Sequence, residues 1–252
     1  MPRLDVCAPA IVLRTVDYGD RDRIVTLLVA GHGRRGAMAK SARASKKRFA
    51  GALEPLRVIE ASYIDRDPSR LATLTSAEVI EHFAGVESSF DKTSLASYAT
   101  ELTRELARDG VPDDDLLNLL VGHFRALSTG AETLDTLEDL HTTFVLRAID
   151  GAGFLPALAV CARCHRDVDA STQWRFVPEA GAVCAACRRP GASGAEVMPP
   201  TLRFLADRAL RSSGAPDAPH VRVRARSVLR DMVRGMLGRD LKSAHFLDMV
   251  LR

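Results

Sequence analysis

Four of the five cysteines of this 252-residue chain lie in one short stretch and form two C-x-x-C pairs. The pairs are Cys161-Ala-Arg-Cys164 and Cys184-Ala-Ala-Cys187, with 19 residues between them. Cysteines at this spacing are typical of zinc ribbons, in which two tight turns supply four tetrahedral thiolate ligands. We therefore predict that Cys161, Cys164, Cys184 and Cys187 hold one Zn²⁺ ion.

Four thiolates complete the coordination of zinc, whereas a catalytic zinc keeps one position open for water or substrate. The predicted zinc is therefore structural. A dithiol redox pair is the competing interpretation, but it would need a βαβ setting that the pattern lacks. His165 could replace Cys164 as a ligand, although an exposed position on the ribbon is the simpler interpretation. Cys7 lies in a predicted strand and is expected to be a buried, small apolar residue.

A second group of chemically active residues lies near the N-terminus. Residues 32–48 contain seven Lys/Arg and no acidic residue, separated mostly by small side chains. Such a segment can be a solvated loop, but a basic strip between strands can also follow a phosphate backbone. The predicted DNA-binding residues are Arg14, Arg34, Arg35, Lys40, Arg43, Lys46, Lys47 and Arg48.

Proteins that bind single strands usually also stack bases on aromatic rings. The N-terminal region offers only Tyr18, Phe49 and Tyr63. Tyr63 is expected in the core, and Phe49 is the stacking candidate, although an anchoring place in the core fits it equally well. Binding should therefore depend mainly on phosphates and tolerate different base sequences.

The net charge of +3 conceals a strong division along the chain. Residues 1–60 carry a net +6, residues 77–150 a net −10 and residues 151–252 a net +7. Two basic ends around an acidic centre suggest two separate anion-binding surfaces. The composition is that of a globular protein, with no membrane-length apolar run and no signal peptide. We therefore expect a cytoplasmic protein with reduced thiols and no membrane association.

The chain reads as strands first and helices later. Strand patterns and turn signals occur at residues 8–18, 22–30, 34–42, 55–64 and 71–77, which favours a small five-stranded barrel of the OB type, or one of the SH3 type. Helical periodicity begins after residue 78. Helices are predicted at residues 94–110, 113–130, 136–153, 199–213 and 226–251, a hairpin strand at 172–178, and a linker at 215–220.

The N-terminal residues resemble a known family. The segments "IVLRTVDYGDRDRIVTLL", "HGRRGAMAKSARASKKRFAGALEPL" and "LTSAEVIEHF" are similar to the N-terminal domain of the RecO family of bacterial recombination mediators. "LRAIDGAGFLPALAVCARC" and "GRDLKSAHFL" resemble later motifs of that family. The resemblance implies an α+β fold, with an OB-fold barrel at residues 1–78 and an α-helical domain at 79–252. A zinc ribbon-like module with four cysteine ligands would be inserted at about residues 158–192.

The resemblance also implies a non-enzymatic role. Members of the family bind single- and double-stranded DNA and anneal complementary strands. Together with RecR they help to load RecA onto DNA coated by the single-strand-binding protein SSB. A place in the cytoplasm, associated with the nucleoid, follows from that role.

The residues themselves offer no catalytic constellation. No GxxxxGK[ST] motif occurs, and Val183 rather than proline precedes Cys184, unlike in zinc deaminases. His123 and His141 fall on predicted helices and are expected to be surface or core residues. The acidic, aromatic-ended SSB tail should prefer a basic pocket with an apolar floor, for which Arg203, Phe204 and Arg208 are candidates, with a solvated basic face as the alternative. A zinc-ribbon adaptor for protein interactions, without DNA activity, is the other interpretation of the whole chain.

Overall fold

The computed structural model describes residues 4–45, 47–67, 70–130, 133–189, 194–210 and 219–250. The chain forms two compact units, and each is described below by itself. The first contains Met1–Leu137 and His245–Arg252, and the second contains Glu138–Ala244. The domain boundary expected near residue 78 stays a prediction.

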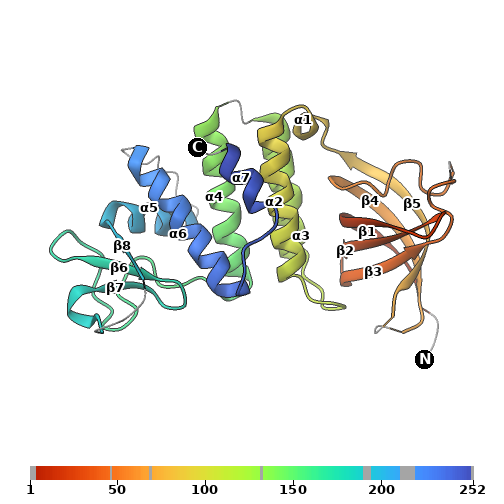
Figure 1. Ribbon diagram of the computed structural model, residues 1–252. Coiled ribbons are helices and arrows are strands. Elements are labelled where there is room, and N and C mark those ends of the chain that lie inside the picture. Colours follow the sequence, from red (N-terminus) through yellow and green to blue (C-terminus); the bar gives the residue numbers. More distant parts are fainter. Residues whose placement is uncertain are drawn as a thin grey trace. The chain divides into compact units, whose positions relative to one another are not determined.

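Five strands of the first unit form a closed barrel, as the sequence predicted (Figure 1). The strands are β1 Leu4–Tyr18, β2 Asp22–Val29, β3 Gly33–Ala39, β4 Arg57–Asp65 and β5 Ala72–His82. Their order around the barrel is β1-β2-β3-β5-β4, and only the β3–β5 pair is parallel. This arrangement is OB-like. The strand β5 extends five residues beyond the predicted end at residue 77, into the segment that was expected to begin the helices.

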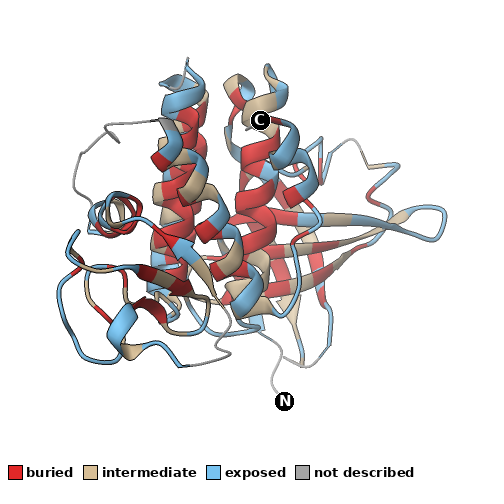
Figure 2. Cartoon of the chain, turned by 60° about the vertical axis from the view of Figure 1, so that its left-hand side comes forward, coloured by how far each residue is buried: buried red, intermediate tan, exposed pale blue. Residues whose placement is uncertain are grey.

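Side chains alternate between the interior and the exterior of the barrel, because successive residues of a strand point to opposite faces. In Figure 2 the strands of the barrel carry buried residues along much of their length. Val6 is buried in β1, so its neighbour Cys7 points outward and is exposed. The expectation that Cys7 is a buried apolar residue is therefore wrong, and its sulfur instead accepts a hydrogen bond from the Ser62 hydroxyl at 3.5 Å.

Helices follow the barrel in the first unit. They are α1 Ala84–Glu87, α2 Phe90–Leu106 and α3 Asp114–Thr129, and α7 Ala244–Val250 returns to this unit near the C-terminus. Helix α3 begins where the three consecutive aspartates predicted it, since the Asp113 carboxylate caps it by accepting from the Leu116 N–H at 3.0 Å. Asp114 and Asp115 then lie in the first turn, where the helix dipole favours negative charge.

The second unit combines helices with a small sheet. Its elements are α4 Leu134–Gly151, which begins in the first unit, β6 Trp174–Val177, β7 Gly181–Cys184, the 3₁₀ turn η1 Ala185–Cys187, β8 Ala195–Val197, α5 Pro199–Ala209 and α6 Pro219–Leu237. The strands pair in the order β7-β6-β8, and all pairs are antiparallel. The predicted hairpin strand at residues 172–178 is confirmed. Figure 1 shows this sheet beside α5 and α6.

The single helix predicted over residues 226–251 is wrong. The structure has two helices, because Gly238 adopts a left-handed φ of 70° and its N–H bonds to the Arg234 carbonyl at 2.8 Å. Glycine in this conformation is a common way to end a helix. The first of the two helices also begins earlier, at Pro219, within the predicted linker. Residues 215–218 of that linker lie outside the described part of the chain.

Candidate metal centre and nucleic-acid interface

The four predicted zinc ligands meet in the second unit. Their sulfur atoms all lie within 4.8 Å of one another, and the Sγ atoms of Cys164 and Cys184 are 3.7 Å apart. A tetrahedral zinc with Zn–S bonds of about 2.3 Å places its sulfur atoms about 3.8 Å apart. The cluster is therefore compatible with a single zinc ion.

Local backbone structure explains why the cysteines converge. The hairpin register places Trp174 opposite Cys184, so the second cysteine pair begins at the open end of the β6–β7 hairpin. The first pair lies in a turn that two backbone bonds close: Cys161 N–H to the Arg166 carbonyl at 2.8 Å, and His165 N–H to the Cys161 carbonyl at 2.9 Å. The two turns are referred to below as the knuckles.

The pKa values of the thiols also favour a bound cation. Burial acts to raise the pKa of Cys161, but hydrogen bonds from the backbone of Cys184, Cys164 and Arg163 outweigh it and lower this pKa to about 6. Side-chain hydrogen bonds with Cys164 and Cys184 raise the pKa of Cys187 to about 12. Without a cation the cluster therefore cannot become fully deprotonated at neutral pH, and a divalent ion would remove that obstacle.

His165 stands next to the cluster rather than in it. Its side chain is exposed and its φ is 59°, a left-handed conformation that is uncommon for residues other than glycine. Among the described residues, the metal-ligating group at this place consists of the four cysteines. The simpler interpretation of His165, an exposed ribbon residue, agrees with this position.

The second candidate site is the outer face of β1, β2 and β3. The register places Arg14 beside Thr26 and Gly36 in one row across the three strands. A bulge between Val12 and Arg14 sets the outward parity of the rest of β1. Arg14, Val16 and Tyr18 are exposed at alternate positions of this strand, and Asp17 between them is exposed as well.

The predicted DNA-binding residues fall into two groups. Arg14, Lys40 and Lys47 are exposed, with no ion pair recorded in the described part of the chain. Lys46 lies outside the described residues. Arg43 and Arg48 are exposed but also hold their own loop: Arg43 bonds the Asp20 carbonyl at 3.2 Å and pairs with Asp17, and Arg48 bonds the Lys40 carbonyl at 2.8 Å.

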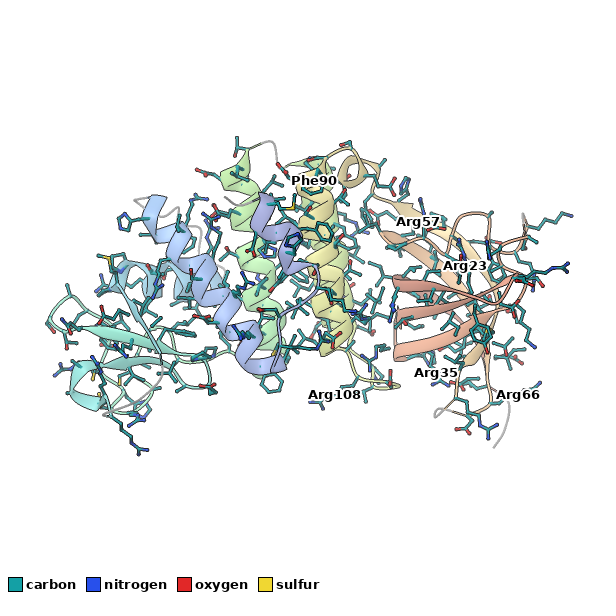
Figure 3. The ribbon with its side chains drawn as sticks, in the orientation of Figure 1. Arg23, Arg35, Arg57, Arg66, Phe90 and Arg108 are labelled. Carbon is teal, nitrogen blue, oxygen red and sulfur yellow. The ribbon has the colours of Figure 1, made fainter. Side chains whose placement is uncertain are left out.

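Arg34 and Arg35 are each paired with a carboxylate of the protein. The Arg34 guanidinium donates to the Asp109 carboxylate at 2.7 Å and to the Arg104 carbonyl at 2.5 Å. Arg35 points into the barrel, is 5% exposed and donates to the Asp65 carboxylate at 2.5 Å. Figure 3 marks its place on the barrel. Both arginines therefore stabilise the fold through these contacts, and their role in DNA binding stays a prediction.

The structure decides between the two places expected for Phe49. Phe49 is 2% exposed and belongs to the barrel core, with the Arg48 guanidinium 5.1 Å from its ring centre. Tyr63 is buried, as expected. Tyr18 is 56% exposed at the end of β1, so it is the ring of this region that a base can reach. The alternation from Arg14 to Tyr18 was the available signal, although the bulge obscured it.

A polar hollow of about 330 Å³ adjoins this face. Its lining includes Thr26 and Gly36 from the outer face of the barrel, together with Arg34, Arg70 and Arg104. Arg70 is exposed and lies outside the basic segment at residues 32–48. Asp109 also lines the hollow, and Arg34, Arg70 and Arg104 are each paired with a carboxylate, so the hollow is a mixed polar surface beside the outer face.

The residues expected for the SSB tail are engaged in internal contacts. Arg203 donates to the Val168 carbonyl at 3.0 Å, Phe204 is 7% exposed, and Arg208 donates to the Asp139 carboxylate at 2.8 Å. A pocket of about 470 Å³ lies between β6, β8 and the beginnings of α5 and α6. Its lining is mostly apolar, and His220 and Arg224 contribute to it.

The fold and the cysteine cluster define the class: an OB-type barrel protein with a helical part and a candidate zinc centre. Family models for "Recombination protein O N terminal" and "Recombination protein O C terminal" match residues 4–83 and 87–245. The chain therefore belongs to the RecO family of DNA repair and recombination proteins.

Curated relatives agree with this assignment. The chain is 38% identical to the DNA repair protein RecO of Anaeromyxobacter sp. (strain K) over 243 residues, which cover 94% of each chain. It is 33% identical to the DNA repair protein RecO of Myxococcus xanthus over 243 residues, which cover 96% of each chain. None of the helices in the described ranges has the length and apolar character of a membrane span.

Proposed function

We propose that this protein is a non-enzymatic recombination mediator that binds single- and double-stranded DNA, chiefly through the outer face of its barrel. The observation that carries the proposal is the exposure of Arg14, Tyr18, Lys40 and Lys47 around one edge of that face. Phosphates would bind the cations, and an unstacked base would lie on the tyrosine ring.

Asp17 pairs with Arg43, one of the predicted DNA-binding residues, whereas Arg14, Lys40 and Lys47 have no ion pair recorded among the described residues. Asp17 is paired with Arg23 at 3.0 Å, and the Asp22 carboxylate accepts from the Ser41 N–H at 2.7 Å. These contacts hold the loop after β3 against the β1–β2 turn. The loop therefore presents Lys40 and Lys47 outward from a fixed base.

Annealing follows from the same electrostatics. Two complementary strands repel each other as polyanions, and a basic surface reduces that repulsion by releasing condensed counterions. Base pairing supplies the specificity, so the protein need not read the bases. With RecR, the protein would help to load RecA onto SSB-coated DNA at the nucleoid.

One zinc ion, held by Cys161, Cys164, Cys184 and Cys187, belongs to the proposal. Four thiolates leave no open position, so the metal would stabilise the fold rather than react. The 470 Å³ pocket with Arg224 beside Met198 and Trp174 supports a site for the acidic, aromatic-ended SSB tail. Arg224→Glu should weaken binding of that tail peptide, and unchanged binding would remove the pocket from the proposal.

The decisive experiment measures binding of a fluorescent single strand by anisotropy at several salt concentrations. The combined variant Arg14→Gln, Lys40→Gln, Lys47→Gln should bind more weakly and lower the salt slope by about 0.7 for each lost phosphate contact. Extending the change to Lys46, Lys47 and Arg48, each to Ala, tests the rest of the basic strip in the same way.

Arg66→Gln provides the matched control. Arg66 is exposed and follows Asp65, which pairs with Leu4 at the start of β1, whereas Tyr18 ends that strand. Figure 3 shows Arg66 at the end of β4. A loss in the control of about one third of that in the triple variant would mean that only net charge matters, because the control removes one cation and the triple variant three. Absence of binding by the natural protein at low salt would favour the adaptor without DNA activity.

A further inference from the structure

We infer that the cysteine knuckles of the second unit carry another phosphate-binding surface for nucleic acid, made by Arg163, Arg166, Arg188 and Arg189. These residues are called the knuckle arginines. The inference rests on the proposed DNA-binding function and adds to it a surface on the other compact unit.

The knuckle arginines differ from several other arginines of the same unit. Several cations of α5 and α6 are paired inside the unit: Arg208 and Arg222 share the Asp139 carboxylate at 2.8 Å and 3.0 Å, and Arg226 pairs with Glu138 at 2.7 Å. These arginines are thus held by carboxylates of α4.

The knuckle arginines are not used in this way. All four are exposed, and within the described residues none has an ion pair with a carboxylate. The nearby carboxylate of Asp169 is engaged by the backbone N–H and hydroxyl of Ser171 at 2.9 Å and 2.6 Å. Glu179 lies at the closed end of the hairpin, beyond the Val177–Gly181 pair and away from Cys184. The exposed Asp167 adjoins Arg166, and Arg166 also interacts with the charge of Asp169, so the four arginines exceed the two nearby carboxylates and leave a net positive charge for an external anion.

The knuckles also hold these side chains on a firm base. The Arg166 carbonyl accepts from the Cys161 N–H, and the Arg163 guanidinium reaches across to the Cys187 carbonyl at 3.2 Å. The Arg188 N–H bonds back to the Ala185 carbonyl at 3.3 Å. Cations from both cysteine pairs thus belong to one small surface, and arginine is well suited to phosphate because of its planar set of donors.

A competing role for these arginines is to offset the charge of the metal centre. Four thiolates and one Zn²⁺ leave a net negative charge, which nearby guanidinium groups would stabilise. Cys161 and Cys184 are buried, but Cys164 is exposed and Arg163 reaches the Cys187 carbonyl, so the position of the arginines fits both roles. The two roles differ in what is lost when the arginines are replaced, which makes them separable.

The test compares Arg188→Gln/Arg189→Gln with the natural protein in single-strand binding at several salt concentrations. Zinc content and thermal unfolding are measured on the same samples. The variant should retain zinc and its unfolding temperature, and its salt slope should fall by about 1.4, for two lost phosphate contacts. Arg188→Lys/Arg189→Lys should restore the slope, because lysine keeps the charge. Arg163→Gln and Arg166→Gln, made singly, should each lower it by about 0.7.

Arg234→Gln is the control, since Arg234 is exposed on α6 beside Gly235, which packs on Pro178 just beyond the closed end of the hairpin. An unchanged slope in the knuckle variants, or loss of zinc without loss of DNA binding, would overturn the inference. The barrel variant Arg14→Gln, Lys40→Gln, Lys47→Gln separates the two proposals. If it alone weakens binding, the knuckle surface is wrong and the proposed function stands. If the natural protein does not bind DNA, both are wrong.

Discussion

Gly33 of the barrel packs directly against the backbone of Val111, in the loop between α2 and α3. A Cβ atom on Gly33 would lie 2.0 Å from the Val111 carbonyl oxygen, and its φ of 73° is left-handed. The neighbouring Arg34 N–H bonds to the Arg108 carbonyl at 3.1 Å, and the Gly110 N–H returns to the Arg34 carbonyl at 3.1 Å. The barrel is therefore joined to its helices by a backbone contact that tolerates no side chain at this position.

Gly33→Ala should destabilise the protein by about 3 kcal/mol or more, because it combines an unfavourable φ with a clash against backbone. Gly31→Ala is the matched variant, since Gly31 has a φ of 69° but a Cβ atom added there would meet no atom within 4 Å. That variant should cost only about 1–2 kcal/mol. Urea unfolding of both measures the difference, and equal losses would refute the packing argument.

Cys161→Ser should lower the zinc content and the thermal unfolding temperature together, because the metal is expected to stabilise the second unit. Cys7→Ser should change neither, since Cys7 is exposed on the barrel and lies outside the cluster. Metal analysis combined with calorimetry gives both quantities. A Cys161→Ser protein that loses its zinc and its DNA activity but keeps its unfolding temperature would contradict a structural role.

Arg35→Ala should cost about 3–5 kcal/mol, because it leaves the Asp65 carboxylate partly buried without its cation. The side chains of Arg35 and Asp65 are only 6% and 16% exposed. Arg66→Ala removes an exposed arginine next to that carboxylate and should change the free energy of unfolding by less than about 0.5 kcal/mol. Chemical denaturation measures the free energy of unfolding of both variants. Similar losses of stability would show that the buried ion pair contributes no more than the exposed Arg66 does.

The stability of the protein should fall as the pH drops from neutral toward 4. Burial lowers the pKa of His141 to about 4, from an ordinary value of 6.5. Between these values His141 is protonated in the unfolded chain but neutral in the folded chain. This group alone therefore lowers the free energy of unfolding by about 2 kcal/mol between pH 7 and pH 5. His141→Gln should reduce the loss over this range by that amount. Parallel pH profiles for the two proteins would contradict the assignment.

Much of the architecture was predictable because it depends on local patterns. The strands follow from alternation and turn residues, and α3 follows from an aspartate cap and an acidic first turn. The spacing of the two cysteine pairs predicted a site with four thiolate ligands, and the four sulfur atoms meet as predicted. Gly238 was also visible in the sequence, but only its left-handed conformation revealed that it ends a helix.

The use of individual charges was not predictable in the same way. Arg34 and Arg35 are adjacent in a uniformly basic segment, yet one pairs with Asp109 and the other points into the barrel toward Asp65. Their partners lie 75 and 30 residues away in sequence. Likewise, nothing in the sequence distinguishes the arginines of α5 and α6 from the knuckle arginines. Only in the structure do carboxylates of α4 pair with Arg208, Arg222 and Arg226.

The sequence by itself determined the barrel, the helical part, the cysteine cluster and the family. It did so because each depends on periodicity or spacing within a short stretch of chain. Only the tertiary structure decided which cations and which ring face solvent. It exposed Tyr18 and buried Phe49, since strand parity after a bulge and packing against distant segments determine burial. It also separated Arg208, Arg222 and Arg226, which pair with α4, from the exposed arginines of the knuckles, because ion pairing depends on residues that only folding brings together.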